Sequence, residues 1–197
     1  MSLLSHNQIA DLLEDGIIEN ADYDCINSAS LDIHIGRIIL VEKLHENTRL
    51  TGMSRVLSLK QKDALTVDQY DLEKHGHFIL RPGQFILAHS QEIFNLPADI
   101  SAEYKLNSSM ARIGLEHLNA GWCDAGWNGS CLTLELRNLT TYHEIEICYG
   151  DRIGQMVFFK HLPVPADRSY AVRGRYNGDT EVSGVKPDIA APGNEIV

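Results

Sequence analysis

Residues 104–138 read YKLNSSMARIGLEHLNAGWCDAGWNGSCLTLELRN and join one short helix signal to turn and strand signals. A helix that begins at Ser108 and Ser109 and stops before Gly114 fits the residue types that start and end helices. Three glycines and an asparagine within residues 121–129 predict a turn between two strands. One helical turn among strands is typical of an all-β domain.

Residues 131–136, CLTLEL, predict the strand that follows this turn. The side chains alternate with period two, which places the leucines on one face and Glu135 with Thr133 on the other. A single glutamate on the polar face of a strand is most often a solvated residue. Its position after the short helix and the glycine-rich turn, in that order, favours a functional interpretation.

Strand signals also dominate the rest of the chain. They lie at residues 33–41, 78–80 and 84–88. A helix is predicted over residues 5–14, where Ser5 and Gln8 form a capping box. Many short strands separated by glycine and proline turns predict an all-β sandwich or barrel with minor helices. We expect one domain over residues 1–182 and a loose tail over residues 183–197.

The composition of the 197 residues is that of a globular protein, with 44% hydrophobic residues and a mean hydropathy of −0.17. The net charge of −10 argues against a nucleic-acid polymer as partner, because proteins that bind one carry a basic patch. The sequence has neither an apolar run of membrane-spanning length nor a signal peptide pattern. Four cysteines in a chain of this size are expected as reduced thiols, which predicts a cytoplasmic location.

The central stretch resembles the active-site core of the deoxycytidine triphosphate (dCTP) deaminases and of their relatives, the trimeric dUTPases. The segments K-L-N-S-S-M-A-R, A-G-W-C-D-A-G-W-N-G and T-L-E follow the order of that family's motifs. Residues 27–36 and 150–158 resemble its flanking strands, and residues 175–179, RYNGD, resemble its nucleotide lid. The resemblance covers nearly the whole chain. It implies a distorted jelly roll of the dUTPase type with a lid over residues 165–182.

The activity implied by the resemblance is hydrolytic deamination at C4 of cytosine, which converts dCTP to dUTP and ammonia and feeds dUMP and dTTP synthesis. Glu135 would be the proton shuttle between water, the ring nitrogen and the leaving ammonia. Arg112 would hold Glu135 and the water, and Ser108 would bond in the region of the water or the base. Zinc is not expected, because zinc deaminases use a P-C-x-x-C motif and this chain has no C-x-x-C.

The resemblance also implies residues that bind the nucleotide. Ser109 would bind phosphate, Asp124 would hold the sugar 3′-hydroxyl, and the backbone at Thr133 and Leu134 would read the cytosine edge. The full set of expected nucleotide-binding residues is Lys105, Asn107, Ser109, Met110, Ala111, Asp124, Thr133, Leu134, Tyr170, Arg175, Tyr176 and Asp179. No metal is expected on the protein itself, and Mg²⁺ is expected with the phosphates of the nucleotide.

Two positions depart from the family pattern. Asn107 stands where the family usually has an arginine that meets phosphate, and Asp179 stands where its lid usually has glutamine. Lys105 lies two residues before Asn107, on the same face of an extended segment, so it would replace the lost charge. Both departures indicate altered phosphate handling, which keeps dCMP or a modified nucleotide open as the substrate.

Other functions fit the same residues. Asp124 stands where dUTPases place their water-activating aspartate, so a bifunctional enzyme that forms dUMP and pyrophosphate is an alternative. A nucleotide-sensing protein without catalysis is a second alternative. The family implies a homotrimer with sites between subunits, here about 66 kDa from three chains of 22.0 kDa, and dTTP as a feedback inhibitor.

Overall fold

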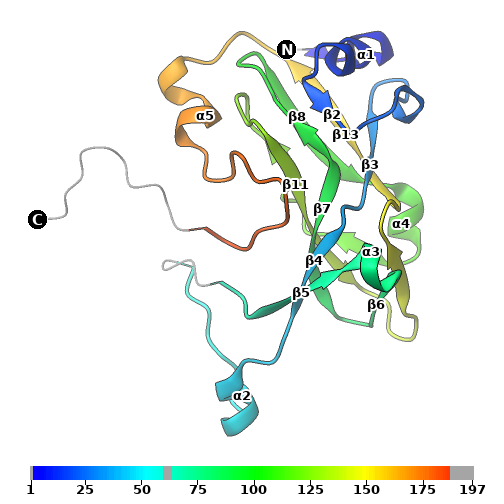
Figure 1. Cartoon of the computed structure of the whole chain (residues 1–197), viewed down its shortest axis with the longest axis vertical. Coiled ribbons are helices and arrows are strands. Elements are labelled where there is room, and N and C mark those ends of the chain that lie inside the picture. The colour runs from blue at the N-terminus through cyan, green and yellow to red at the C-terminus, as the bar shows by residue number, and fades with distance from the viewer. Residues whose placement is uncertain (1, 60–63, 187–197) are drawn as a thin grey trace, which may run out of the picture.

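The computed structural model describes residues 2–59 and 64–186, and most of their regular structure is β-sheet (Figure 1). A five-stranded sheet runs in the order β1-β13-β8-β10, with β3 paired to β13. A six-stranded sheet runs in the order β5-β4-β7-β11-β9, with β2 paired to β7, and β12 pairs with β6 in a third, two-stranded sheet. The predicted all-β class with minor helices is therefore confirmed.

The strands have the following bounds. In the five-stranded sheet they are β1 (Ser2–Leu3), β3 (Leu31–His34), β8 (Ile100–Leu106), β10 (Trp122–Cys123) and β13 (Arg152–Lys160). In the six-stranded sheet they are β2 (Ile18–Glu19), β4 (Ile38–Glu42), β5 (Val67–Asp71), β7 (Phe85–Phe94), β9 (Leu115–His117) and β11 (Ser130–Asn138). The two-stranded sheet contains β6 (His77–Leu80) and β12 (Ile145–Cys148).

The helices are short. Helix α1 (His6–Glu14) matches the helix predicted from the capping box, in which the Gln8 side chain accepts the Ser5 N–H at 3.0 Å. Helix α4 (Ser108–Arg112) matches the helical turn predicted in the central stretch. The remaining helices are α2 (Glu46–Thr51), α3 (Leu72–His75) and α5 (Tyr170–Arg173), with 3-10 turns at Tyr23–Cys25 and Ala166–Arg168. Every described helix is too short or too polar to cross a lipid bilayer.

The segment predicted as one strand over residues 33–41 is two strands, β3 and β4, which belong to different sheets. The chain changes sheet at Gly36, whose N–H donates to His89 O at 2.6 Å. A Cβ at Gly36 would lie 2.2 Å from the His89 ring, so only glycine allows this close approach. The hydrophobic pattern of residues 33–41 could not show this break because both strands bury apolar side chains.

The two larger sheets bury a common core. The rings of Phe94 on β7 and Phe158 on β13 lie 6.4 Å apart, so the core joins one sheet to the other. The leucines of β11 point into it: Leu134 and Leu136 are fully buried and Leu132 is 6% exposed. The predicted apolar face of this strand is therefore confirmed, and its opposite face is free for another use.

The chain leaves β13 and returns to β11 through α5 and the residues that follow. We call residues 174–186 the C-terminal strap. Its backbone lies at the end of β11, where Cys131 N–H donates to Asp179 O at 2.8 Å. The Trp127 ring N–H donates to Tyr176 O at 3.1 Å. Figure 1 shows α5 and the strap on one side of the molecule and α4 on the other.

Candidate active site

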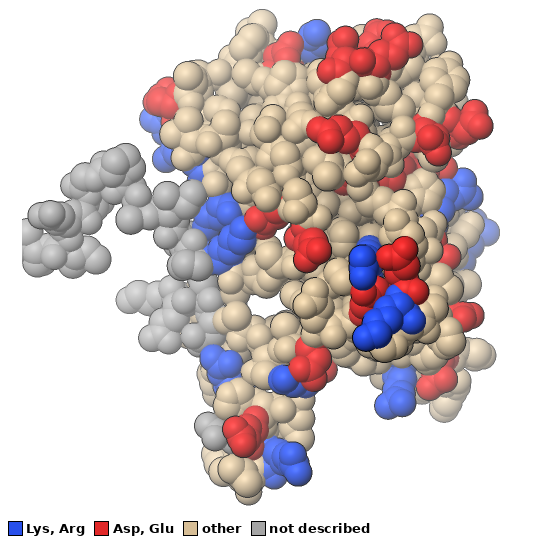
Figure 2. Space-filling view, viewed as in Figure 1, with Lys and Arg blue, Asp and Glu red and all other residues tan. Residues whose placement is uncertain are grey.

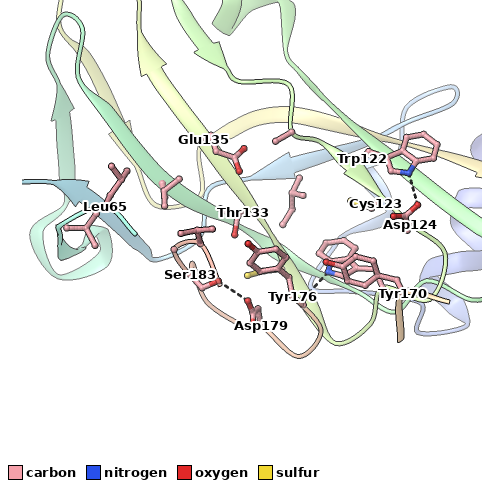
Figure 3. A pocket seen from close by; sticks show the side chains of 18 of the residues that line it. Leu65, Trp122, Cys123, Asp124, Thr133, Glu135, Tyr170, Tyr176, Asp179 and Ser183 are labelled. Atoms are coloured by element: carbon pink, nitrogen blue, oxygen red, sulfur yellow. Dashed lines mark hydrogen bonds between the residues drawn. The ribbon is translucent and has the colours of Figure 1, made fainter. Parts of the chain in front are cut away.

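A cavity of about 550 Å³ lies between the polar face of β11 and the C-terminal strap (Figure 3). Its wall is mainly apolar and aromatic, and its volume is typical of small-molecule sites. The acidic residues Asp124, Glu135 and Asp179 line the cavity. None of the described residues that line it is a lysine or an arginine. The lining residues are Leu65, Val67, Phe85, Leu87, Ala120, Trp122, Cys123, Asp124, Trp127, Cys131, Leu132, Thr133, Glu135, Tyr170, Tyr176, Asp179, Ser183, Gly184 and Val185.

Strand β11 supplies the centre of this cavity. Glu135 and Thr133 line it, as their shared face predicted, and Leu87 on β7 lies directly opposite Glu135. The Glu135 side chain is 24% exposed, so it reaches both the cavity and the protein interior. Leu134 is fully buried, and its side chain points away from the cavity into the core. Its backbone N–H and C=O point toward β7, where Leu134 pairs with Ala88, rather than toward the open edge.

The edge of β11 beside the cavity is open at Thr133. On this edge Leu118 N–H donates to Glu135 O at 3.2 Å, and β9 pairs with β11 only beyond that point. Alternate residues of an antiparallel strand direct their backbone groups to the same side, so Thr133 N–H and C=O point to this edge as Glu135 O does. A planar base with donors and acceptors along one edge could bond there.

Asp124 lies on the turn after β10, where the glycine-rich segment was predicted to turn. Its carboxylate accepts the Trp122 ring N–H at 2.9 Å, which fixes its direction beside the cavity. Figure 3 shows Asp124 next to Trp122 and away from Glu135. The two acids are therefore separate groups that would meet different parts of one ligand.

Helix α5 and the strap bring predicted lid residues to the cavity. Tyr170 and Tyr176 line it, and the Arg175 guanidinium lies 5.6 Å from the centre of the Tyr176 ring. Asp179 forms an ion pair with Lys186 and accepts the Ser183 hydroxyl at 2.8 Å. The acid that replaces the family's glutamine is thus neutralised within the strap.

The predicted boundary between lid and tail falls inside this strap. Ser183, Gly184 and Val185 line the cavity, although the sequence analysis assigned residues 183–197 to a loose tail. Residues 187–197 lie outside the described part of the chain.

The residues predicted on and before α4 do not reach the cavity of the same chain. Ser108, Ser109, Ala111 and Arg112 are exposed, and Met110 is half-buried. None of these five lines the cavity. Figure 1 shows α4 on the side of the molecule opposite the strap. One chain therefore separates the predicted catalytic Arg112 and Ser108 from Glu135.

The two residues discussed as phosphate ligands have local partners. The Asn107 side chain caps α4 by accepting Ser109 N–H at 2.9 Å. Lys105 forms an ion pair with Glu103, and its side chain is 52% exposed. Because such exposed pairs contribute little, Lys105 can exchange Glu103 for another anion.

The sequence analysis missed His117, the last residue of β9. Its Nε2 lies 3.2 Å from Glu135 Oε2, and its side chain is only 3% exposed. The residue pairs with Leu136 across the sheet, a register that requires the fold. The aromatic wall of Trp122, Trp127 and Phe85 was missed for the same reason.

Two cysteines line the cavity without adding charge. Burial raises the pKa of the Cys131 thiol to about 12 and raises that of Cys123 further, so both are protonated near neutral pH. Among the described residues, no group of three His, Cys, Asp or Glu side chains is arranged to hold a metal ion.

A family model described as dCTP deaminase-like matches residues 3–161. The chain belongs to the dCTP deaminase-like family. The predicted family is thereby confirmed, and the match includes β11, α4 and Asp124 but ends before α5 and the strap.

Named relatives extend the match over most of the chain. A "dCTP deaminase, dUMP-forming" of Thermobifida fusca is 31% identical over 188 residues, which are 89% of this chain and 88% of that protein. A "dCTP deaminase, dUMP-forming" of Hydrogenobaculum sp. is 34% identical over 166 residues, which are 83% of this chain and 85% of that protein.

A solved structure supports the fold. The 2′-deoxycytidine 5′-triphosphate deaminase of Agrobacterium tumefaciens superposes with a TM-score of 0.62 and 21% identity. The superposition covers 81% of this chain and 48% of that one, so the present chain spans about half of its length. The predicted jelly-roll type is confirmed by this likeness.

Proposed function

We propose that the protein is a hydrolase that deaminates dCTP. The observation that carries this proposal is Glu135, which projects into a nucleotide-sized cavity beside the open strand edge at Thr133. The cytosine edge would bond to the Thr133 backbone, which brings C4 close to a carboxylate able to move protons. The relatives named dCTP deaminases support the same chemistry.

The reaction requires one water molecule and one group that carries protons. Glu135 takes a proton from the water molecule while the water oxygen attacks C4. Glu135 then delivers this proton to N3 of the ring. It then moves the remaining hydroxyl proton to the amino group, which leaves as ammonia while the C4 carbonyl forms. A positioned acid–base group of this kind typically contributes ~10²–10⁴ in rate.

We propose dUMP rather than dUTP as the final product. The relatives are named dUMP-forming, so they favour the bifunctional alternative over the dUTP product that the sequence analysis put first. Asp124 is available for the second step, because it lies in the cavity at a place distinct from Glu135. There it would direct a second water to the phosphate chain, which releases pyrophosphate.

We propose that α4 of another copy completes the site. The described lining contains three carboxylates and no lysine or arginine, whereas a triphosphate requires cations. Arg112, Ser108 and Ser109 lie exposed on the far side of the same chain, so they can meet the cavity of a neighbour. A contact between two different surfaces gives a closed ring when the rotation between copies closes, and the homotrimer implied by the family would be such a ring. Mg²⁺ would enter as part of the nucleotide substrate.

Chromatography of the products formed from dCTP and Mg²⁺ tests this function. We expect dUMP and pyrophosphate from the wild-type protein, and dUTP from an Asp124→Asn variant that keeps deamination but loses the second step. Accumulation of dUTP by the wild type would contradict the proposed product. An unchanged dCTP peak would contradict the proposed substrate, and dCMP would then be assayed. Addition of dTTP to the same assay tests feedback inhibition.

A further inference from the structure

Three buried side-chain atoms in the described residues have no hydrogen-bond partner: Tyr104 Oη, His117 Nε2 and Glu135 Oε2. Buried polar atoms are nearly always paired, so each exception requires an explanation. The three atoms belong to one cluster beside the cavity. His117 Nε2 lies 3.2 Å from Glu135 Oε2, and the His117 ring lies edge-on to the Tyr104 ring with 4.7 Å between their centroids.

Tyr104 forms a rigid support behind the imidazole. It is 3% exposed on β8, and its backbone and ring are packed against two glycines. A Cβ at Gly154 would lie 2.2 Å from Tyr104 Oη, and a Cβ at Gly121 would lie 2.8 Å from Tyr104 O. The tyrosine has no room to move back, so it limits the positions open to His117.

A proton must lie between His117 and Glu135 when the carboxylate is ionised. An unprotonated ring nitrogen and a carboxylate oxygen both present lone pairs, which repel at 3.2 Å. A protonated Nε2 would instead face an acceptor. The separation is that of an ion pair, but the orientation falls outside hydrogen-bond geometry. The two groups are already close enough for a hydrogen bond, which would form once the carboxylate or the ring reorients.

We infer that His117 is a positioning residue for Glu135, whose Oε2 it holds through Nε2–H while Oε1 remains free to exchange protons with the attacking water. The Tyr104 ring supports the imidazole from the other side. This inference rests on the proposed deamination and assigns His117 no contact with the nucleotide. It explains why a buried histidine and a buried carboxylate oxygen lie together without other partners.

Steady-state kinetics on dCTP test the inference with two variants and a control. His117→Leu removes the donor, and we expect kcat to fall about 10- to 150-fold, the loss typical for a hydrogen bond to a charged group. KM should change less than about threefold, because the nucleotide contacts remain. His117→Gln restores a donor at a similar reach and should recover most of kcat. His143→Leu removes an exposed histidine and serves as the matched control.

A second measurement does not require turnover. The ¹⁵N resonance of His117 Nε2 in the nucleotide-free protein should move when Glu135 is changed to Gln, whereas the other histidines should not respond. Thermal unfolding of each variant shows whether it is folded. An unmoved resonance would overturn the inference, as would a His117→Leu variant with kcat within about twofold of the wild type. Absence of wild-type turnover would refute the proposed function alone, since the resonance still reports on the pair.

Discussion

The cavity wall on β11 and the exposed helix α4 carry the two halves of the same predicted site in different ways. On β11 the functional side chains are held by a buried strand, with leucines on one face and Glu135 on the other. On α4 the side chains of Ser108 and Arg112 are exposed and do not line the cavity of the same chain. A chain can therefore carry every residue of a motif without bringing them together in a single site of its own.

Charge separates the two regions as well. The cavity carries Asp124, Glu135 and Asp179, of which Asp179 forms an ion pair with Lys186. Arg112 ends α4, where a cation is favourable, and it is exposed. Figure 2 shows how the acidic and basic side chains are distributed on the face that carries the strap. In the proposed assembly, an anionic substrate would gain most where Arg112 of one copy meets the acidic cavity of another.

The largest effect is expected from Glu135→Gln, which keeps the shape of the cavity wall and removes its proton carrier. We expect turnover of dCTP to fall by ~10²–10⁴ while binding changes little. Single-turnover product analysis measures the first quantity, and calorimetric titration with dCTP measures the second. Near-normal turnover would show that Glu135 is not the proton carrier.

Arg112→Ala tests whether the exposed helix α4 contributes to turnover. We expect kcat/KM for dCTP to fall about 10- to 150-fold, because a hydrogen bond to a charged group is lost. The exposed position of Arg112 leaves the fold unaffected, so the melting temperature should stay near that of the wild type.

Mixing this variant with Glu135→Gln tests whether the halves come from different copies. After co-refolding into random assemblies, about a quarter of the sites would pair an intact α4 with an intact Glu135. We expect activity to return toward that fraction. A mixture as inactive as its components would show that both residues act within one chain.

Acid should lower the free energy of unfolding through His89, which lies on β7 opposite Thr133 of β11. Burial lowers the pKa of His89, which donates from Nδ1 to Ser90 O and accepts Ile38 N–H at Nε2. Its stabilising contribution is therefore complete above the unfolded-state value near 6.5 and is lost as pH falls through the lower folded-state value. Urea unfolding should show a loss of at most about 1 kcal/mol between pH 6.5 and 5.5 that a His89→Gln variant lacks. Equal pH dependence in both proteins would contradict this.

The smallest effect is expected from Lys186→Ala, which removes the partner of Asp179 in the strap. Both side chains are partly exposed, so the ion pair contributes at most about 1 kcal/mol. We expect KM for dCTP to rise less than about fivefold with kcat unchanged. A change of more than an order of magnitude would instead place Lys186 among the phosphate ligands.

The sequence predicts the two faces of strand β11 well, because its leucines alternate with polar residues at a period of two. Glu135, Thr133 and the buried Leu134 all lie where the pattern puts them. The helical turn at α4 was predictable for a similar reason, since its boundary residues act locally. Asp124, Tyr170 and Tyr176, which the family motifs predicted to bind the nucleotide, line the cavity.

What the sequence does not contain is the pairing of distant segments. His117 meets Glu135 only through the register of β9 on β11, and Gly36 divides the mainly apolar segment 33–41 only because His89 lies across it. The distance from α4 to the cavity likewise depends on the path of the whole chain. These relations arise from long-range packing, which no local pattern reports.

The alternation on β11 also decides how this protein could acquire a new base specificity. Thr133 and Glu135 face the cavity, whereas Leu134 and Leu136 are fully buried in the core. A library that randomises Thr133 while keeping the leucines would therefore search ligand preference with most members still folded. One strand thus allows directed evolution to explore recognition at a cavity-facing codon while the neighbouring codons preserve the scaffold.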